Sequence, residues 1–133
     1  MLDTNLCIRV LSDRPQELRT WFNAEADAMC ISTIMLAELL HGASKSARPI
    51  ENRREVRHFA SRLEVLPFDA EAASHSAEIR TTLERLGHLI GPYDLLIAGY
   101  ARSRGLVVVT GNLGEFERVE GLRREDWLAA PPP

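Results

Sequence analysis

Cysteine is scarce in this sequence of 133 residues, and long hydrophobic runs are absent. The two cysteines, Cys7 and Cys30, form no C-x-x-C or other metal-ligand spacing, so we expect buried thiols in a reducing cytoplasm. Charged residues interrupt every apolar stretch before the roughly 20 residues that a membrane-spanning helix needs. The first residues form neither the basic nor the apolar segment of a secretory signal.

Several catalytic motifs are also missing. The sequence contains no phosphate-binding G-x-x-x-x-G-K-[ST] loop, no G-x-G-x-x-G and no G-x-S-x-G, which argues against nucleotide cradling and serine hydrolysis. No lysine follows Lys45, which argues against an aspartyl-phosphate mechanism. The four histidines lack zinc-binding spacing: His41, His58, His75 and His88.

The composition is that of an ordinary globular protein, with 45% hydrophobic and 26% charged residues. We expect a single domain over residues 1–128 and a loose C-terminal tail over 129–133. The net charge of −3 argues against coating nucleic acid by charge alone. The basic residues, however, are fifteen arginines and one lysine, and arginine suits bidentate phosphate contacts.

Short apolar segments alternate with amphipathic helical patterns along the chain. We expect strands at 1–3, 28–31, 65–68 and 106–109, the last being β-branched and typical of the interior of a parallel sheet. A long helix should begin after Asp69 and end at Gly87, and its apolar residues are Ala73, Ala77, Ile79, Leu83 and Leu86. The alternation predicts an α/β fold, a three-layer α/β/α sandwich with a short central parallel sheet.

Three carboxylates are expected near one edge of this sheet. Asp3 ends the first strand, Glu38 lies on the helix after the second, and Asp94 lies in the first turn of a helix opened by Pro92. Thr110 and Asn112 follow the last strong strand. Parallel sheets place their sites at the carboxyl ends of strands, and a divalent cation relieves repulsion between clustered acids. Taken singly, each acid could instead be a helix cap or a half-exposed helix residue.

The chain resembles the PIN-domain family, and within it the VapC toxins of type II toxin–antitoxin systems. The resemblance runs nearly end to end and points to the subgroup that cleaves initiator tRNA in the anticodon region. It is carried by these segments: Met1-Leu2-Asp3-Thr4-Asn5, Ala37-Glu38-Leu39, Gly91-Pro92-Tyr93-Asp94-Leu95-Leu96-Ile97-Ala98, Val109-Thr110, Glu115-Phe116-Glu117-Arg118-Val119, Gly121-Leu122 and Glu125-Asp126-Trp127.

The resemblance implies an endoribonuclease that depends on Mg²⁺ or Mn²⁺ and hydrolyses RNA phosphodiester bonds. By position, Asp3, Glu38 and Asp94 are the metal-binding acids. Asn112 falls where many relatives carry a fourth acid, and Glu115 is the rival for that position. The resemblance also implies a homodimer and a VapB-like antitoxin partner.

Two other functions stay open at this stage. One is a catalytically silent PIN-like module that binds another protein, and the other is a structure-specific DNA nuclease. The arginines of the segment 48–62 also allow two interpretations. Arg53, Arg54 and Arg57 could contact tRNA phosphates, or they could form salt bridges with Glu51 and Glu55.

Overall fold

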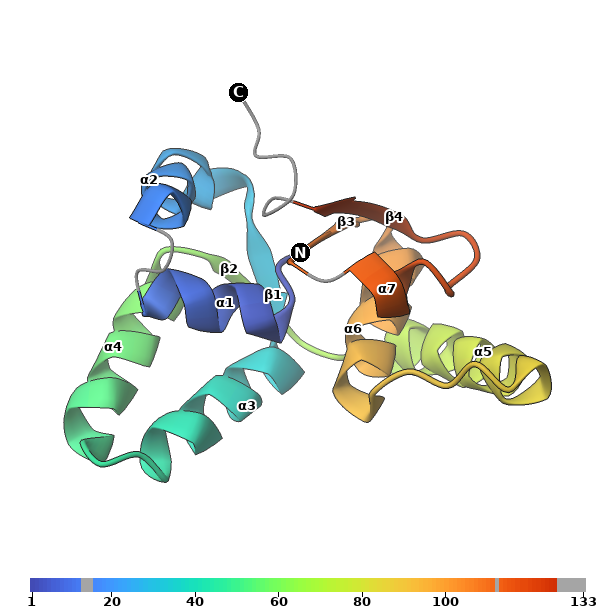
Figure 1. Ribbon diagram of the computed structural model, residues 1–133, viewed down its shortest axis with the longest axis horizontal. Coiled ribbons are helices and arrows are strands. Elements are labelled where there is room, and N and C mark those ends of the chain that lie inside the picture. Colours follow the sequence, from blue (N-terminus) through green and yellow to red (C-terminus); the bar gives the residue numbers. More distant parts are fainter. Residues whose placement is uncertain (13–15, 112, 127–133) are drawn as a thin grey trace. The chain divides into compact units, whose positions relative to one another are not determined.

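The computed structural model describes residues 1–12, 16–111 and 113–126. The expected tail at 129–133 and the candidate residue Asn112 lie outside these ranges. The chain divides into two compact units, one formed by Leu2–Pro67 and the other by Met1 with the residues from Phe68 onward. Figure 1 shows the elements of both.

The unit Leu2–Pro67 is mainly helical. Its elements are α1 (Thr4–Leu11), α2 (Gln16–Glu25), a 3₁₀ turn (Ala26–Ala28), β1 (Cys30–Ser32), α3 (Thr33–Ser44), α4 (Pro49–Ser61) and β2 (Glu64–Leu66). The two strands pair in parallel, with Ile31 opposite Val65. The first expected strand is reduced to Leu2, whose N–H donates to the Cys30 carbonyl at 3.0 Å.

Local sequence signals start the helices of this unit. The Ser32 side chain accepts a hydrogen bond from the Met35 N–H at 3.2 Å and caps α3, while a proline opens α4. The rings of Phe22 and Phe59 stack with their centroids 4.8 Å apart, which joins α2 to α4. Both cysteines are buried free thiols, as expected.

The second unit contains a helix pair and a parallel strand pair. Its elements are α5 (Ala70–Leu86), α6 (Pro92–Arg104), β3 (Val107–Thr110), α7 (Leu113–Phe116) and β4 (Arg123–Asp126). Asp69 caps α5 by accepting from the Ala72 N–H at 2.9 Å. Gly87 and Gly105 end α5 and α6 at φ +69° and +64°, where a side chain would be strained.

Strand β3 has hydrogen-bonded neighbours on both sides. It pairs in parallel with β4, Val109 lying opposite Glu125. On its other side, the Met1 amino group donates to the Val107 carbonyl at 2.7 Å, and the Val109 N–H donates to the Met1 carbonyl at 2.8 Å. This confirms the expectation that the apolar segment 106–109 belongs inside a parallel sheet.

Two details of the second unit differ from the sequence expectations. The elements α7 and β4 were not expected, because α7 has four residues and the sequence of β4, Arg-Arg-Glu-Asp, has no apolar alternation. The apolar residues expected along α5 are buried only in part: Ile79 and Leu83 are buried, whereas Ala73, Ala77 and Leu86 are exposed and Ser76 is buried. Ser76 faces α6 because Gly99 has no side chain there.

The contact between Ser76 and Gly99 predicts a contrast between two helical glycines. A Cβ at Gly99 would lie 2.8 Å from the Ser76 Cα, whereas a Cβ at Gly42 in α3 would meet no atom within 4 Å. We expect Gly99→Ala to lower the free energy of unfolding by about 1–3 kcal/mol through overpacking. Gly42→Ala should raise it by about 0.5–1 kcal/mol through helix propensity. Urea unfolding measures both, and equal stability of the two variants would contradict the packing described.

Candidate active site

Asp3 is a buried carboxylate at the start of α1. The residue is only 2% exposed, and its Oδ1 accepts a hydrogen bond from the Leu6 N–H at 2.8 Å. Asp3 is thus the N-cap of α1, and the positive end of the helix dipole favours its ionised form. The capping role that the sequence allowed is confirmed.

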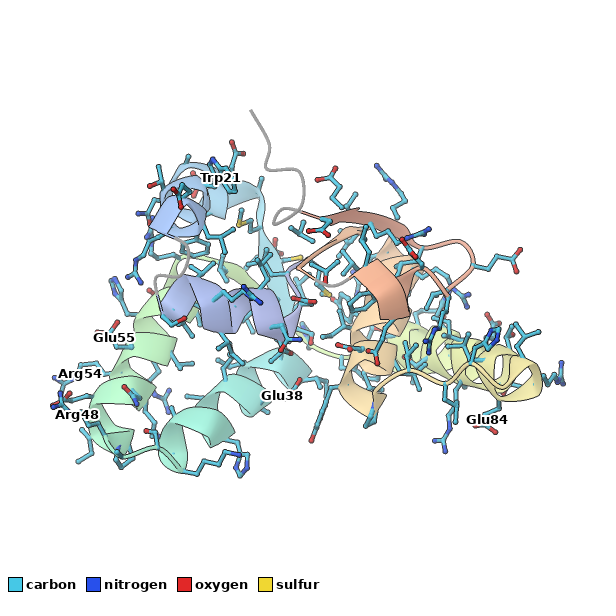
Figure 2. The ribbon with its side chains drawn as sticks, viewed as in Figure 1. Trp21, Glu38, Arg48, Arg54, Glu55 and Glu84 are labelled. Carbon is cyan, nitrogen blue, oxygen red and sulfur yellow. The ribbon has the colours of Figure 1, made fainter. Side chains whose placement is uncertain are left out.

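Glu38 is joined to the residue that follows Asp3. The Thr4 hydroxyl donates to Glu38 Oε1 at 2.9 Å, which links the first turn of α1 to α3. Figure 2 labels Glu38 on α3. Partial burial raises the pKa of Glu38 above its ordinary value, and the hydrogen bond from Thr4 opposes that rise. The second carboxylate oxygen of Glu38 makes no hydrogen bond within the described part of the chain, so it is available to a ligand.

In the other unit, Asp94 and Glu115 approach the same glycine. The Gly91 N–H donates to Glu115 Oε1 at 3.3 Å. A Cβ at Gly91 would lie 3.7 Å from both Asp94 Oδ2 and Glu115 Oε2. Asp94 is in the first turn of α6, as expected, and the turn before that helix therefore brings two carboxylates together. This role of Gly91 was not predicted from the sequence, although the Gly-Pro pair marks the turn.

The carboxylate and hydroxyl oxygens of these candidate residues are the kind of ligand that a hard divalent cation such as Mg²⁺ prefers. Asp3, Glu38 and Thr4 belong to the unit Leu2–Pro67, and Asp94 and Glu115 to the other. Within residues 1–12, 16–111 and 113–126, no group of three or more acidic, histidine or cysteine side chains is arranged to hold a metal ion. Asn112 is outside those residues, and Thr110 is fully buried at the end of β3.

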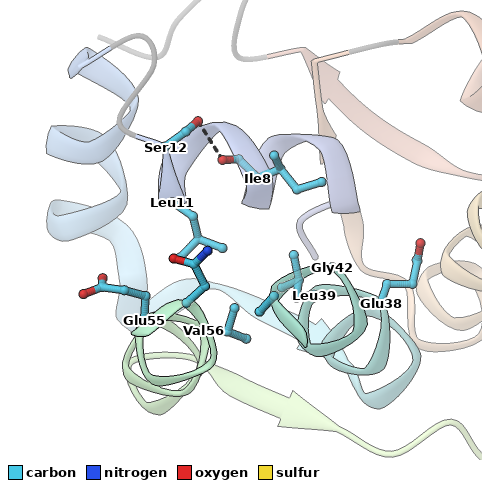
Figure 3. Close-up of a pocket in the computed structure, with 10 residues that line it drawn as sticks. Ile8, Leu11, Ser12, Glu38, Leu39, Gly42, Glu55 and Val56 are labelled. Atoms are coloured by element: carbon cyan, nitrogen blue, oxygen red, sulfur yellow. Dashed lines mark hydrogen bonds between the residues drawn. The ribbon is translucent and has the colours of Figure 1, made fainter. Parts of the chain in front are cut away.

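Glu38 also lines a pocket of about 420 Å³ between α1, α3 and α4 (Figure 3). Its walls are chiefly apolar, with Ile8, Leu11, Leu39 and Val56. Glu38 and Glu55 are its two acidic residues. This pocket was not predicted from the sequence, because its lining comes from three helices and α1 is separated from α3 by other elements.

Comparison with known proteins identifies the family. The PIN domain matches residues 1–122 of the chain. The chain is a PIN-domain protein of the VapC family. It is 54% identical to the tRNA(fMet)-specific endonuclease VapC of Salmonella typhimurium over 127 residues, which cover 96% of each chain. It is 46% identical to the ribonuclease VapC2 of Haemophilus influenzae, covering 96% of this chain and 97% of that one.

Solved structures agree with this assignment. The crystal structure of DNA-bound VapBC from Salmonella typhimurium matches with a TM-score of 0.91 and 54% identity, covering 96% of each chain. VapBC2 from Rickettsia felis, also bound to DNA, matches with a TM-score of 0.89 and 38% identity over 96% of this chain and 97% of that one. The α/β fold expected from the sequence is therefore confirmed as the PIN fold.

A more distant structure has the same fold. VapBC-5 of Mycobacterium tuberculosis, a member of the VapBC family of toxin–antitoxin systems, matches with a TM-score of 0.58 and 30% identity. The match covers 71% of this chain and 77% of that one. None of the described helices has the length and apolar character needed to cross a membrane.

The raised pKa of Glu38 predicts a pH-dependent effect of its replacement in metal-free protein. Between its ordinary and raised pKa the folded state binds more protons than the unfolded state, so this group removes stability as pH rises through that window. Glu38→Gln should therefore raise the melting temperature near neutral pH, with a gain that disappears toward about pH 4. Thermal melts in EDTA test this.

Thr4→Val is the opposite control. It removes the hydrogen bond that lowers the pKa of Glu38, so its destabilisation should grow as pH rises. A Glu38→Gln difference that is constant across pH would contradict the burial of an ionised Glu38.

Proposed function

We propose that this protein is a toxin endoribonuclease that hydrolyses tRNA, with initiator tRNA as the substrate that its relatives indicate. The observation that carries the proposal is the 54% identity, over 96% of both chains, with a relative named for tRNA(fMet)-specific cleavage. Asp3, Glu38 and Asp94 are all present as carboxylates, which supports catalysis over a silent binding role.

We propose Mg²⁺ as the cofactor, with Mn²⁺ as a substitute. Asp3 and Asp94 would hold the ion directly, and Glu38 would bind a second ion or orient its water. When bound, the cation neutralises the cleaved phosphate, lowers the pKa of the attacking water and stabilises the leaving oxygen. The Thr4 hydroxyl holds Glu38 by one oxygen and leaves the other for this task.

For the fourth position we favour Glu115 over Asn112. The Gly91 N–H fixes one oxygen of Glu115, and its carboxylate approaches the same glycine as Asp94. Glu115 also brings a negative charge, whereas an asparagine offers only a neutral carbonyl oxygen. Asn112, with Thr110, would complete the surroundings of the bound water.

The proposal includes a partner and a place of action. Relatives solved as VapBC complexes support neutralisation by a VapB-like antitoxin, and we propose a homodimeric toxin. Two buried free thiols, Cys7 and Cys30, support action in the reducing cytoplasm. We propose that residues 1–128 act as a single PIN-like domain.

Removal of divalent metal should abolish cleavage of purified tRNA by the purified protein. EDTA should stop the reaction, and excess Mg²⁺ or Mn²⁺ should restore it, because clustered carboxylates otherwise repel the phosphate. Gel analysis of initiator tRNA against elongator tRNA measures activity and selectivity together. Full cleavage in EDTA would contradict the proposal.

Variants tested in the same assay distinguish the loss of a proposed catalytic acid from the loss of an ordinary surface charge. Asp94→Asn and Glu115→Gln should each reduce the rate at least about 100-fold even in excess metal, because each loses a charged oxygen ligand. Glu120→Gln removes an exposed carboxylate and should cleave normally. Normal cleavage by Asp94→Asn would show that the metal site lies elsewhere.

A further inference from the structure

Helix α4 presents three arginines that the proposed active site does not use. We call Arg53, Arg54 and Arg57 the α4 arginine face. The sequence left two interpretations of these residues, namely salt bridges with Glu51 and Glu55 or contacts with phosphate. The ion pairs present in the structure do not include the salt bridges that the first interpretation expects.

Four ion pairs form among the described residues, and none includes the α4 arginine face. Glu51 pairs with Arg48, at 3.4 Å. Neither Arg54 nor Arg57 forms a hydrogen bond or ion pair within the described part of the chain, and both are exposed. Their guanidinium groups are therefore available to an external anion.

Acidic and basic residues are interspersed on the surface of α4. Arg54 and Arg57 are three residues apart and are neighbours on the helix, and the same spacing makes Glu51 a neighbour of Arg54. Glu51 pairs with Arg48 instead, and no ion pair among the described residues includes Arg54. Glu55 contributes to the pocket between α1, α3 and α4. Figure 2 shows Arg54 projecting from α4 away from α1 and α3.

Arg53 fixes one end of this face. Its Nη1 donates to the Ser44 Oγ at 2.7 Å, which ties α4 to the end of α3. Behind the face, Val56, Phe59 and Ala60 are buried and hold α4 against its unit. The arginines are thus mounted on a packed helix, so that their backbone positions are set before any ligand arrives.

We propose that the α4 arginine face binds phosphates of the RNA substrate away from the scissile bond. This inference rests on the proposed function. Guanidinium groups bind phosphate oxygens with paired donors, and arginines one helical turn apart can contact separate phosphates. Such contacts raise affinity without reading sequence. The charge of the face also opposes the acidic total of the protein, which otherwise repels RNA.

The test measures binding of initiator tRNA by the full chain carrying Asp94→Asn, which prevents cleavage, at several salt concentrations. Adding R54Q and R57Q should weaken binding at least about fivefold at low salt and reduce the slope of log affinity against log salt by between about 1 and 2, because each lost phosphate contact removes about 0.7–0.9. R54K and R57K should retain most of the slope.

The matched control is R80Q with R85Q, which removes the same charge from exposed positions on α5. If this control reduces tRNA affinity and the salt slope as much as R54Q with R57Q does, the loss of binding depends only on total charge and the inference is wrong. It is also wrong if R54Q with R57Q leaves tRNA binding unchanged, including the case in which only antitoxin binding weakens.

If the proposed function itself is wrong, these assays give a different outcome. The parent protein would then neither cleave tRNA in Mg²⁺ nor, as Asp94→Asn, bind it at low salt. In otherwise wild-type protein, R54Q with R57Q should raise KM for tRNA at least about fivefold with kcat unchanged, because the lost contacts are the same in the bound and transition states. A fall in kcat at constant KM would overturn the phosphate-binding role.

Discussion

Three of the candidate acids, Asp3, Glu38 and Glu115, each accept a hydrogen bond that offsets part of the cost of withdrawing a carboxylate from water. An ionised carboxylate withdrawn from water is costly unless a donor or a cation faces it. Asp3 takes the Leu6 N–H, Glu38 the Thr4 hydroxyl and Glu115 the Gly91 N–H. Each of these donors occupies one carboxylate oxygen and orients the side chain before a metal binds.

Helix starts supply much of this support. Asp3 precedes α1 and Asp94 lies in the first turn of α6, where unpaired N–H groups and the helix dipole favour negative charge. The interpretation of these acids as helix caps and their interpretation as catalytic residues are therefore compatible.

The sequence predicted the features that local chemistry controls. The cap at Asp69, the stop at Gly87 and the apolar strand at 106–109 are all confirmed, because each depends on a few neighbouring residues. Asp94 was also placed correctly in the first turn of its helix.

Features controlled by distant residues were missed. Ser76 is buried because Gly99 approaches from another helix, and the charged strand β4 forms because β3 supplies its hydrogen bonds. The contact of Gly91 with Glu115 spans 24 residues, and the pocket beside Glu38 needs three helices. No window of sequence contains such information. Whether the acids act on a single metal site stays a prediction.

In the proposed reaction, an external water attacks the RNA phosphate and the ribose 2′-OH takes no part; a metal held by the carboxylates would activate that water. The chemical ends of the RNA fragments distinguish these routes most directly. Purified protein and initiator tRNA in Mg²⁺ should yield fragments with 5′-phosphate and 3′-hydroxyl ends, identified by ligation-based end sequencing with and without prior phosphatase treatment. Fragments ending in 2′,3′-cyclic phosphate and 5′-hydroxyl would contradict the account.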